Sequence, residues 1–178
     1  IRQALDLMQN SLRTDSAFDF ASSKRSFTVA VEDYGEAVVM PRFMEWLNRV
    51  APGVHVRIRP ESGDALLAEM KRGAIDMAME YHRPQDDQFR VQPLMEETLV
   101  SMVRQGHPLV GDSLSLEQYV TLEHVVIDSR SPRGPLVDRE LKRRGLSRNI
   151  ALQVPHFLSM PLIVRTTDII CTLPLRMA

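Results

Sequence analysis

The chain has 178 residues, of which 44% are hydrophobic and 25% charged, and its formal net charge is −1. This balance is typical of a folded protein with one large domain or two small lobes, and it gives no general attraction to nucleic acid or to an anionic membrane. The single cysteine, Cys171, excludes a disulfide within the chain and argues against a cysteine-based zinc site, and no apolar run approaches the roughly 20 residues of a membrane span.

The first 25 residues combine a short amphipathic stripe with a polar stretch. Ile1, Leu5, Met8 and Leu12 recur at the spacing of one helix face. Two interpretations are open: a helix packed on its own domain, or the end of a longer linker helix. Residues 14–25 are polar and predict a linker.

Residues 27–79 alternate between apolar strand-like runs and amphipathic helical runs. The predicted order is a strand at 27–31, a helix from 38–40 to 50, a strand at 54–58, a helix from the N-cap Ser62 to 71, and a strand at 75–79. Because Pro41 is best tolerated in a first turn, residues 33–37 are expected to form an irregular loop. Parallel strands joined by crossover helices end at one edge of the sheet, where open α/β sheets hold small ligands.

A second alternation of strands and helices follows. Strands are predicted at 91–94, 98–103, 124–127, 150–154 and 169–173, with helices near 115–119, from Pro135 to 144, and at 157–165. We therefore expect two lobes with a cleft between them, the strand at 98–103 carrying the chain into the second lobe.

Catalytic signatures are scarce. The sequence has no GxSxG, HExxH, P-loop or GxGxxG motif. Cys171 and His156 are a conceivable thiol–imidazole pair, but Cys171 lies in an apolar run where a buried structural cysteine is favoured. The five histidines have no ligand-like spacing, so we expect neither a metal nor another cofactor.

The strand ends of the first lobe carry several carboxylates. The first strand leads into Glu32-Asp33-Tyr34-Gly35, the second into Ser62-Gly63-Asp64, and the third into Glu80-Tyr81. One interpretation is helix capping by acids near helix N-termini. The other is a ligand rim that repels small anions unless the second lobe supplies cations, with tyrosine and serine hydroxyls as donors.

The matching edge of the second lobe has the opposite character. Arg130 and Arg133 follow the strand at 124–127, and His156 and Phe157 follow the strand at 150–154. Arginine offers planar donors to a carboxylate, nitro or phenolate group, and histidine changes its charge near neutral pH. The alternatives are a solvated loop for the arginines and a helix cap or core position for the histidine.

Taken in order, these segments resemble the effector-binding (regulatory) domain of LysR-type transcriptional regulators. The matching segments are Phe18 to Phe27, Asp33 to Glu36, Met40 to Phe43, Ala51-Pro52-Gly53, Leu66 to Asp76, Gly106-His107-Pro108, Val154 to Phe157 and Leu173 to Arg176. Asp33-Tyr34-Gly35-Glu36 together with Val154-Pro155-His156-Phe157 is similar to the branch of naphthalene, salicylate and nitrotoluene regulators. Tyr81-His82-Arg83-Pro84 also resembles the nodulation regulators of that branch.

The resemblance implies an α/β fold of two Rossmann-like lobes joined by crossover strands, of the type 2 periplasmic-binding-protein kind. It divides the chain into the end of a linker helix with its linker (1–25), regulatory lobe one (26–100) and regulatory lobe two (101–178). It also implies that the N-terminal DNA-binding domain and the C-terminal return segment of lobe one are absent from this sequence.

Carried over by position, the resemblance also implies an effector site between the lobes. Its residues are Glu32, Asp33, Tyr34, Met40, Ser62, Gly63, Arg133, Gly134, His156 and Phe157. At Arg133 or Gly134 the salicylate-type regulators have a ligand-contacting histidine that this sequence lacks. An aromatic acid or phenol is still the expected effector, because Arg133 would serve the same anion and Phe157 would stack on the ring.

The function implied is that of a cytoplasmic sensor domain, not an enzyme. Its expected partners are a small-molecule effector, DNA through the absent N-terminal domain, and further copies of the chain in a homodimer or homotetramer, with no membrane. A periplasmic-type solute receptor shares the two-lobed design and is the rival interpretation. An enzyme is the third, and would require a clustered acid, base or nucleophile.

Overall fold

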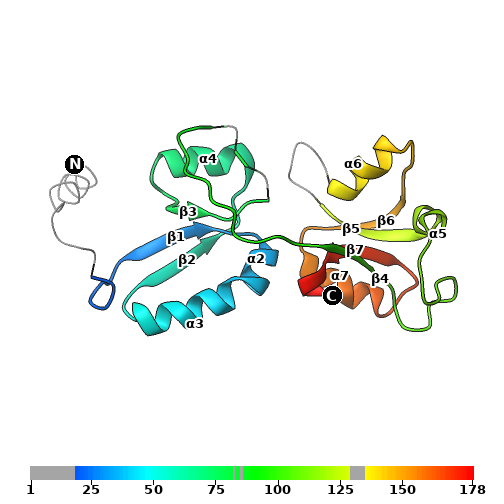
Figure 1. Cartoon of the computed structure of the whole chain (residues 1–178), viewed down its shortest axis with the longest axis horizontal. Coiled ribbons are helices and arrows are strands. Elements are labelled where there is room, and N and C mark those ends of the chain that lie inside the picture. The colour runs from blue at the N-terminus through cyan, green and yellow to red at the C-terminus, as the bar shows by residue number, and fades with distance from the viewer. Residues whose placement is uncertain (1–18, 82, 85, 129–134) are drawn as a thin grey trace.

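The computed structural model describes residues 19–81, 83–84, 86–128 and 135–178. These residues form two α/β lobes that lie side by side, and the chain passes from one to the other through residues 90–98 (Figure 1). We call the lobe around the first sheet lobe one, the lobe around the second sheet lobe two, and residues 90–98 the connecting segment.

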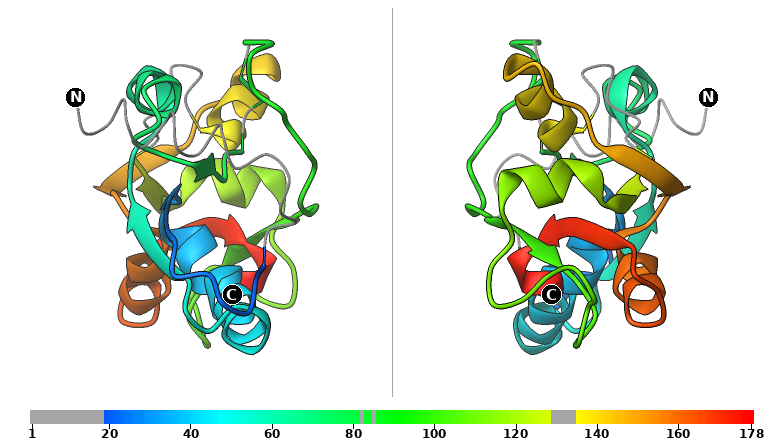
Figure 2. Two further views of the ribbon diagram at one scale, coloured as in Figure 1. Left: turned by 90° about the vertical axis from the view of Figure 1, so that its left-hand side faces the viewer. Right: turned by 90° about the vertical axis from the view of Figure 1, so that its right-hand side faces the viewer.

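Lobe one is built on a parallel three-stranded sheet in the order β2-β1-β3. Its strands are β1 (Ser26–Ala30), β2 (His55–Arg59) and β3 (Met77–Ala78), and its helices are α2 (Asp33–Val38), α3 (Met40–Val50) and α4 (Gly63–Lys71). Helix α4 lies on one side of the sheet and α3 on the other (Figures 1 and 2). Both faces are therefore covered, as a parallel sheet requires.

Two small apolar clusters hold these layers together. Ala30, Leu66 and Ile75 pack on the α4 side of the sheet. On the α3 side the buried residues are Leu47, Ala51 and Val54. The amphipathic face of α3 and the alternating side chains of the strands thus place one helix on each face of the sheet.

Lobe two has a four-stranded sheet in the order β4-β7-β5-β6. Strand β4 runs antiparallel to β7, and the remaining pairs are parallel. The strands are β4 (Leu99–Met102), β5 (Glu123–Ile127), β6 (Asn149–Val154) and β7 (Ile170–Pro174). The helices are α5 (Leu116–Thr121), α6 (Leu136–Arg143) and α7 (Met160–Val164), with two 3₁₀ turns, η1 (Phe157–Ser159) and η2 (Leu175–Met177).

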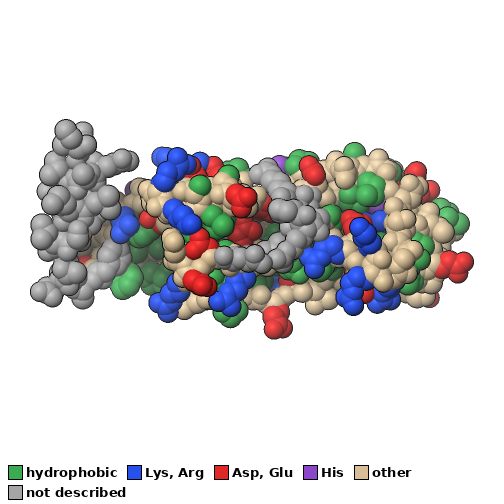
Figure 3. Space-filling model, turned by 90° about the horizontal axis from the view of Figure 1, so that it is seen from above, with side chains coloured by type: hydrophobic (Ala, Val, Ile, Leu, Met, Phe, Trp, Pro, Cys, Tyr) green, Lys and Arg blue, Asp and Glu red, His purple; other side chains and the backbone are tan. Residues whose placement is uncertain are grey.

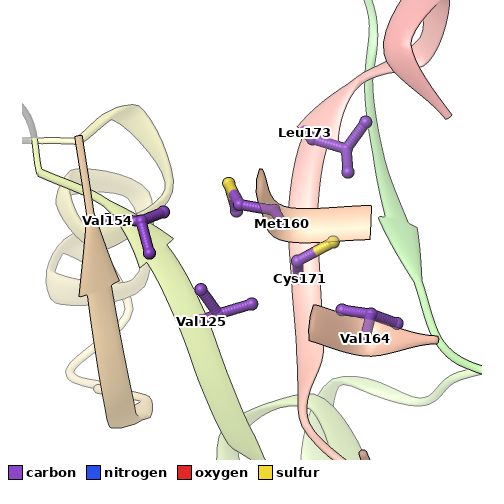
Figure 4. Packing of buried hydrophobic residues seen from close by; sticks show 6 residues of the cluster. All are labelled: Val125, Val154, Met160, Val164, Cys171 and Leu173. Atoms are coloured by element: carbon purple, nitrogen blue, oxygen red, sulfur yellow. The ribbon is translucent and has the colours of Figure 1, made fainter. Parts of the chain in front are cut away.

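The core of lobe two lies between α7 and the sheet. Side chains of β5, β6, β7 and α7 point toward one another there (Figure 4). The cluster consists of Val125, Val154, Met160, Val164, Cys171 and Leu173. Five of these residues have at most 1% of their surface exposed, so this is a closely packed interior: Val125, Met160, Val164, Cys171 and Leu173.

Two predictions of local structure are wrong. Residues 33–37 are not a loop but most of helix α2, because Asp33 and Glu36 place carboxylates in its first turn, where they stabilise the helix N-terminus. The chain then bends at Val39, and Pro41 occupies the first turn of α3 as expected. Residues 91–94 form no strand: they have no neighbouring strand to pair with, and Pro93 cannot donate a ladder hydrogen bond.

The helix expected at 157–165 begins as the 3₁₀ turn η1 and continues as α7. The predicted N-terminal helix at 1–13 and the arginines of the loop at 129–134 lie outside the described residues. Among the residues that the structure describes, no helix combines the length and the apolar character needed to cross a membrane.

The central position of Leu173 makes a test of the lobe-two core possible. Leu173→Ala removes a fully buried side chain and leaves a cavity, so we expect the free energy of unfolding to fall by about 2–5 kcal/mol. Leu162→Ala, on the 67% exposed Leu162 of α7, should change it by less than about 0.5 kcal/mol. Urea unfolding followed by circular dichroism measures both; equal losses would contradict this description of the core.

Candidate functional site

The first turn of α2 lies where lobe one meets lobe two. Val31, directly after β1, donates its amide to the Arg59 carbonyl at 3.1 Å, and the Met79 amide donates to the Ala30 carbonyl at 2.9 Å. The ends of the three strands are thereby fixed together. Glu32 is the N-cap of α2, with extended backbone, so Asp33 and Tyr34 begin the helix at the carboxyl edge of the sheet.

Gly35 allows this helix to sit directly on the strands. A Cβ atom at Gly35 would lie 2.6 Å from Cγ1 of the buried Val31 and would also collide with Cε of Met79. The end of the Met79 side chain is flexible and can move aside, but the β-branched side chain of Val31, directly after β1, is stiff. Glycine is therefore required by the close packing of the helix on the sheet.

Asp33 connects the two lobes. Its Oδ2 accepts a hydrogen bond from the backbone amide of Leu158 at 3.2 Å, although the two residues are 125 positions apart. Leu158 is in the first turn of η1, whose N-cap, His156, makes no side-chain capping bond. Asp33 of lobe one thus supplies the cap that a lobe-two turn lacks.

His156 and Phe157 consequently lie beside α2, on the lobe-two side of the junction. The His156 side chain is exposed. Phe157 is half-buried and packs partly against the lobe-two core, so only part of its ring is available to a ligand. Met40, the first residue of α3, is buried with 9% exposure.

The Tyr34 hydroxyl, which was expected to donate to a ligand, is already hydrogen-bonded within the protein. Its hydroxyl donates to Oε2 of Glu97 in the connecting segment and lies 4.0 Å from Sδ of Met95. Burial and the neighbouring Glu97 carboxylate raise the pKa of Tyr34, so it remains a neutral donor. Sequence reasoning missed Glu97, because nothing in its local pattern points to a partner 63 residues away.

Ser62 and Gly63 form the start of α4 at the same edge of lobe one. The Ser62 hydroxyl makes no capping bond to the helix. Gly63 has φ +63°, and a Cβ atom there would meet nothing within 4 Å, so the space beside it is open. The preceding Glu61 is paired with Arg59, yet its buried Oε2 has no hydrogen-bond partner among the described residues. That oxygen is a further acceptor at this edge.

Two more carboxylates define the electrostatics of this edge. The pKa of Glu80 is raised to about 7, first by burial of the carboxyl group and second by the negative charge of Glu32. Acidic side chains are visible beside the junction of the lobes on the lobe-one side (Figure 3). Glu80 is therefore the carboxyl group at this edge that exchanges a proton near neutral pH.

Arg133 and Gly134 lie outside the described residues. A hollow of about 710 Å³ is lined by the end of α2, by α3 and by the connecting segment, and none of the predicted effector residues that the structure describes lines it. Cys171 is fully buried, and burial raises the pKa of its thiol to about 12, which excludes the thiolate needed for a nucleophile.

The sequence matches the LysR substrate binding domain over residues 21–178. The chain belongs to this family. It is 36% identical over 176 residues to the HTH-type transcriptional activator NagR of a Ralstonia species, covering 98% of this chain and 58% of NagR. It is 30% identical over 178 residues to the HTH-type transcriptional activator NahR of Pseudomonas putida, covering 100% of this chain and 59% of NahR.

The fold has solved counterparts. A probable transcriptional regulator from Pseudomonas aeruginosa superposes with a TM-score of 0.86 at 27% identity, covering 99% of this chain and 60% of that one. The effector-binding domain of QuiR in complex with shikimate shares the fold, with a TM-score of 0.71 at 18% identity over 85% of this chain and 74% of that one. These matches confirm the expected family and the two-lobed type 2 fold. The chain spans about three-fifths of the length of NagR and NahR.

Gly35→Ala tests how the site is positioned. Because Val31 cannot move without disturbing β1, we expect a loss of about 1–3 kcal/mol in the free energy of unfolding. Gly111→Ala is the matched control, since a Cβ atom at Gly111 meets nothing within 4 Å. Urea unfolding of both variants provides the comparison. Equal stability of the two would show that α2 does not need the close approach.

The raised pKa of Glu80 predicts a pH dependence of stability. The folded state retains the proton up to about pH 7, whereas the unfolded state releases it near the ordinary value of 4.5, so this contribution is present below about pH 4.5 and is lost as the pH rises through 7. The side chain in Glu80→Gln is neutral at every pH. We therefore expect the difference in melting temperature between this variant and the wild type to be more favourable to the variant at about pH 8 than at about pH 5. The residue as a whole keeps exposed surface, so solvent reduces the effect. A stability difference that is constant across this range would contradict the assignment.

Proposed function

We propose that this chain is the effector-binding domain of a LysR-type transcriptional regulator that senses a small aromatic acid or phenol between its two lobes. The observation that carries the proposal is the Asp33–Leu158 hydrogen bond, which brings α2 of lobe one against the His156–Phe157 turn of lobe two. Asp33 is one of the residues expected to line the site, and Leu158 directly follows two others, His156 and Phe157, which supports the proposal. Family membership supplies the function that such a junction serves.

The proposed ligand chemistry follows from the groups at the junction. Phe157 presents part of an aromatic ring, His156 presents an exposed imidazole, and the Ser62 hydroxyl is not used in a cap. Glu32 and Glu80 disfavour a small dianion. A planar ring with one acidic group suits this set, with Arg133 as the counter-ion that we propose from sequence position.

The proposed mechanism is a shift between arrangements of the lobes. An effector changes the equilibrium only if it binds one arrangement more tightly than the other. In the whole regulator we propose that this change alters how subunits of a homodimer or homotetramer pack, and so how DNA-binding domains outside these residues are spaced. A cytoplasmic location and the absence of enzymatic activity belong to the same proposal, and NagR and NahR are both named transcriptional activators.

Calorimetric titration of the 178-residue chain with salicylate tests the proposal. We expect saturable binding of one molecule per chain, and weaker binding of salicylamide, which keeps the ring without the carboxylate. Loss of a charge-assisted hydrogen bond should weaken salicylate binding about tenfold or more in Arg133→Ala, with a smaller loss in His156→Ala.

The control variant is Arg139→Ala, which removes an exposed arginine from α6 and should leave the affinity within about twofold of the wild type. The series should also include chlorophenols and other substituted benzoates. If none of these compounds binds saturably, or if binding is unchanged in both site variants, the aromatic effector site is wrong.

A further inference from the structure

The carboxylate of Glu97, in the connecting segment, is hydrogen-bonded to groups from both lobes. Oε2 of Glu97 accepts hydrogen bonds from the Tyr34 hydroxyl and, at 2.9 Å, from Nη1 of Arg176. The same Arg176 nitrogen donates to the Glu96 carbonyl at 3.0 Å. The other Glu97 oxygen, Oε1, accepts from the Thr98 amide at 2.8 Å. Both oxygens of this side chain, which is 17% exposed, are therefore engaged.

The three groups belong to three different parts of the molecule. Tyr34 is in the first turn of α2 in lobe one, Glu97 is in the connecting segment, and Arg176 is in η2, immediately after β7 of lobe two. Beside them the Leu175 amide donates to the Thr98 carbonyl at 2.8 Å, which ties the start of β4 to the end of β7. Glu97 thus joins α2 of lobe one to the connecting segment and to η2 of lobe two.

Tyr34 is also the chain neighbour of Asp33, which caps η1. Because the two residues share one helical turn, a shift of the Tyr34 backbone also shifts the Asp33 backbone, whose carboxylate is bonded to Leu158. The Tyr34–Glu97 bond and the Asp33–Leu158 bond are consequently two fixed points of one short segment. A displacement at either point must be absorbed by the other or must break it.

We infer that Glu97 is a positioning residue for the interlobe site. Through its bond with Tyr34 it holds the first turn of α2 beside η1, and through its bond with Arg176 it passes a change at the site to η2 and the connecting segment. This inference deepens the proposed function and rests on it for the location of the ligand. A bound effector that moves Asp33 away from Leu158 pulls on Tyr34, and so on the Glu97–Arg176 pair.

Amide hydrogen exchange of the whole 178-residue chain, followed by NMR without any ligand, tests the inference. The reporter is the Leu158 amide, whose hydrogen-bond acceptor is Asp33 and neither of the two residues that are changed. We expect Tyr34→Phe and Glu97→Ala each to speed its exchange about tenfold, because the Asp33 cap on η1 is released when the Tyr34–Glu97–Arg176 network loses a member. The double variant should add little to the larger single effect, since both remove the same interaction.

Three controls separate this role from general destabilisation. The Met79 amide, bonded to Ala30 in lobe one, and the Asp128 amide, bonded to Val154 in lobe two, should keep their rates. Tyr119→Phe removes a hydroxyl that lies 2.7 Å from Oγ1 of Thr172 inside lobe two, and should leave the Leu158 amide unchanged.

An unchanged Leu158 rate in Tyr34→Phe would overturn the inference. So would equal acceleration of the Leu158, Met79 and Asp128 amides, since that result assigns the network to global stability alone. Because no ligand is present, failure of salicylate to bind would refute the proposed function without affecting this result.

Discussion

The structure depends on one cap shared between its halves. A short helical turn exposes backbone amides that need an acceptor, and η1 takes the Asp33 carboxylate of lobe one for this purpose. Losing such a cap typically costs about 1 kcal/mol. A bond of that size is strong enough to favour one arrangement of the lobes and weak enough for a ligand to replace, which suits a domain that must switch.

The carboxylates of lobe one have separate tasks. Asp33 caps η1, and Glu61 is paired with Arg59. Glu32 and Glu80 are left as the interacting pair that sets the charge of the edge, with Glu80 able to take up a proton near neutrality. Of the two interpretations that the sequence left open, helix capping therefore applies to Asp33, while a charged ligand rim at Glu32 and Glu80 remains a prediction.

Periodicity was sufficient to predict the alternation of elements, because buried strands and amphipathic helices leave strong apolar patterns. It failed at α2, a six-residue helix without an apolar stripe that contains a glycine for packing reasons. It failed again at 91–94, where an apolar run lacks a neighbouring strand. A strand is defined by its partner, and the partner is not encoded locally.

At the site, too, some features could be predicted from the sequence and others could not. The approach of Asp33 to the His156–Phe157 turn agrees with the predicted facing of the two edges. The engagement of Tyr34 by Glu97 could not be foreseen, because side-chain direction in a turn depends on tertiary packing across 63 positions of sequence. The predicted contacts at Arg133 and Gly134 remain predictions.

The order of strands in lobe two has a consequence for how the protein is made. Strand β7, near the end of this sequence, lies between β4 and β5 in the middle of its sheet. During synthesis β4 and β5 therefore emerge from the ribosome with their shared neighbour still missing. The three described strands of lobe one follow one another along the chain, whereas a nascent chain stopped short of residue 170 would present two unsatisfied strand edges in lobe two, a form prone to aggregation and attractive to chaperones.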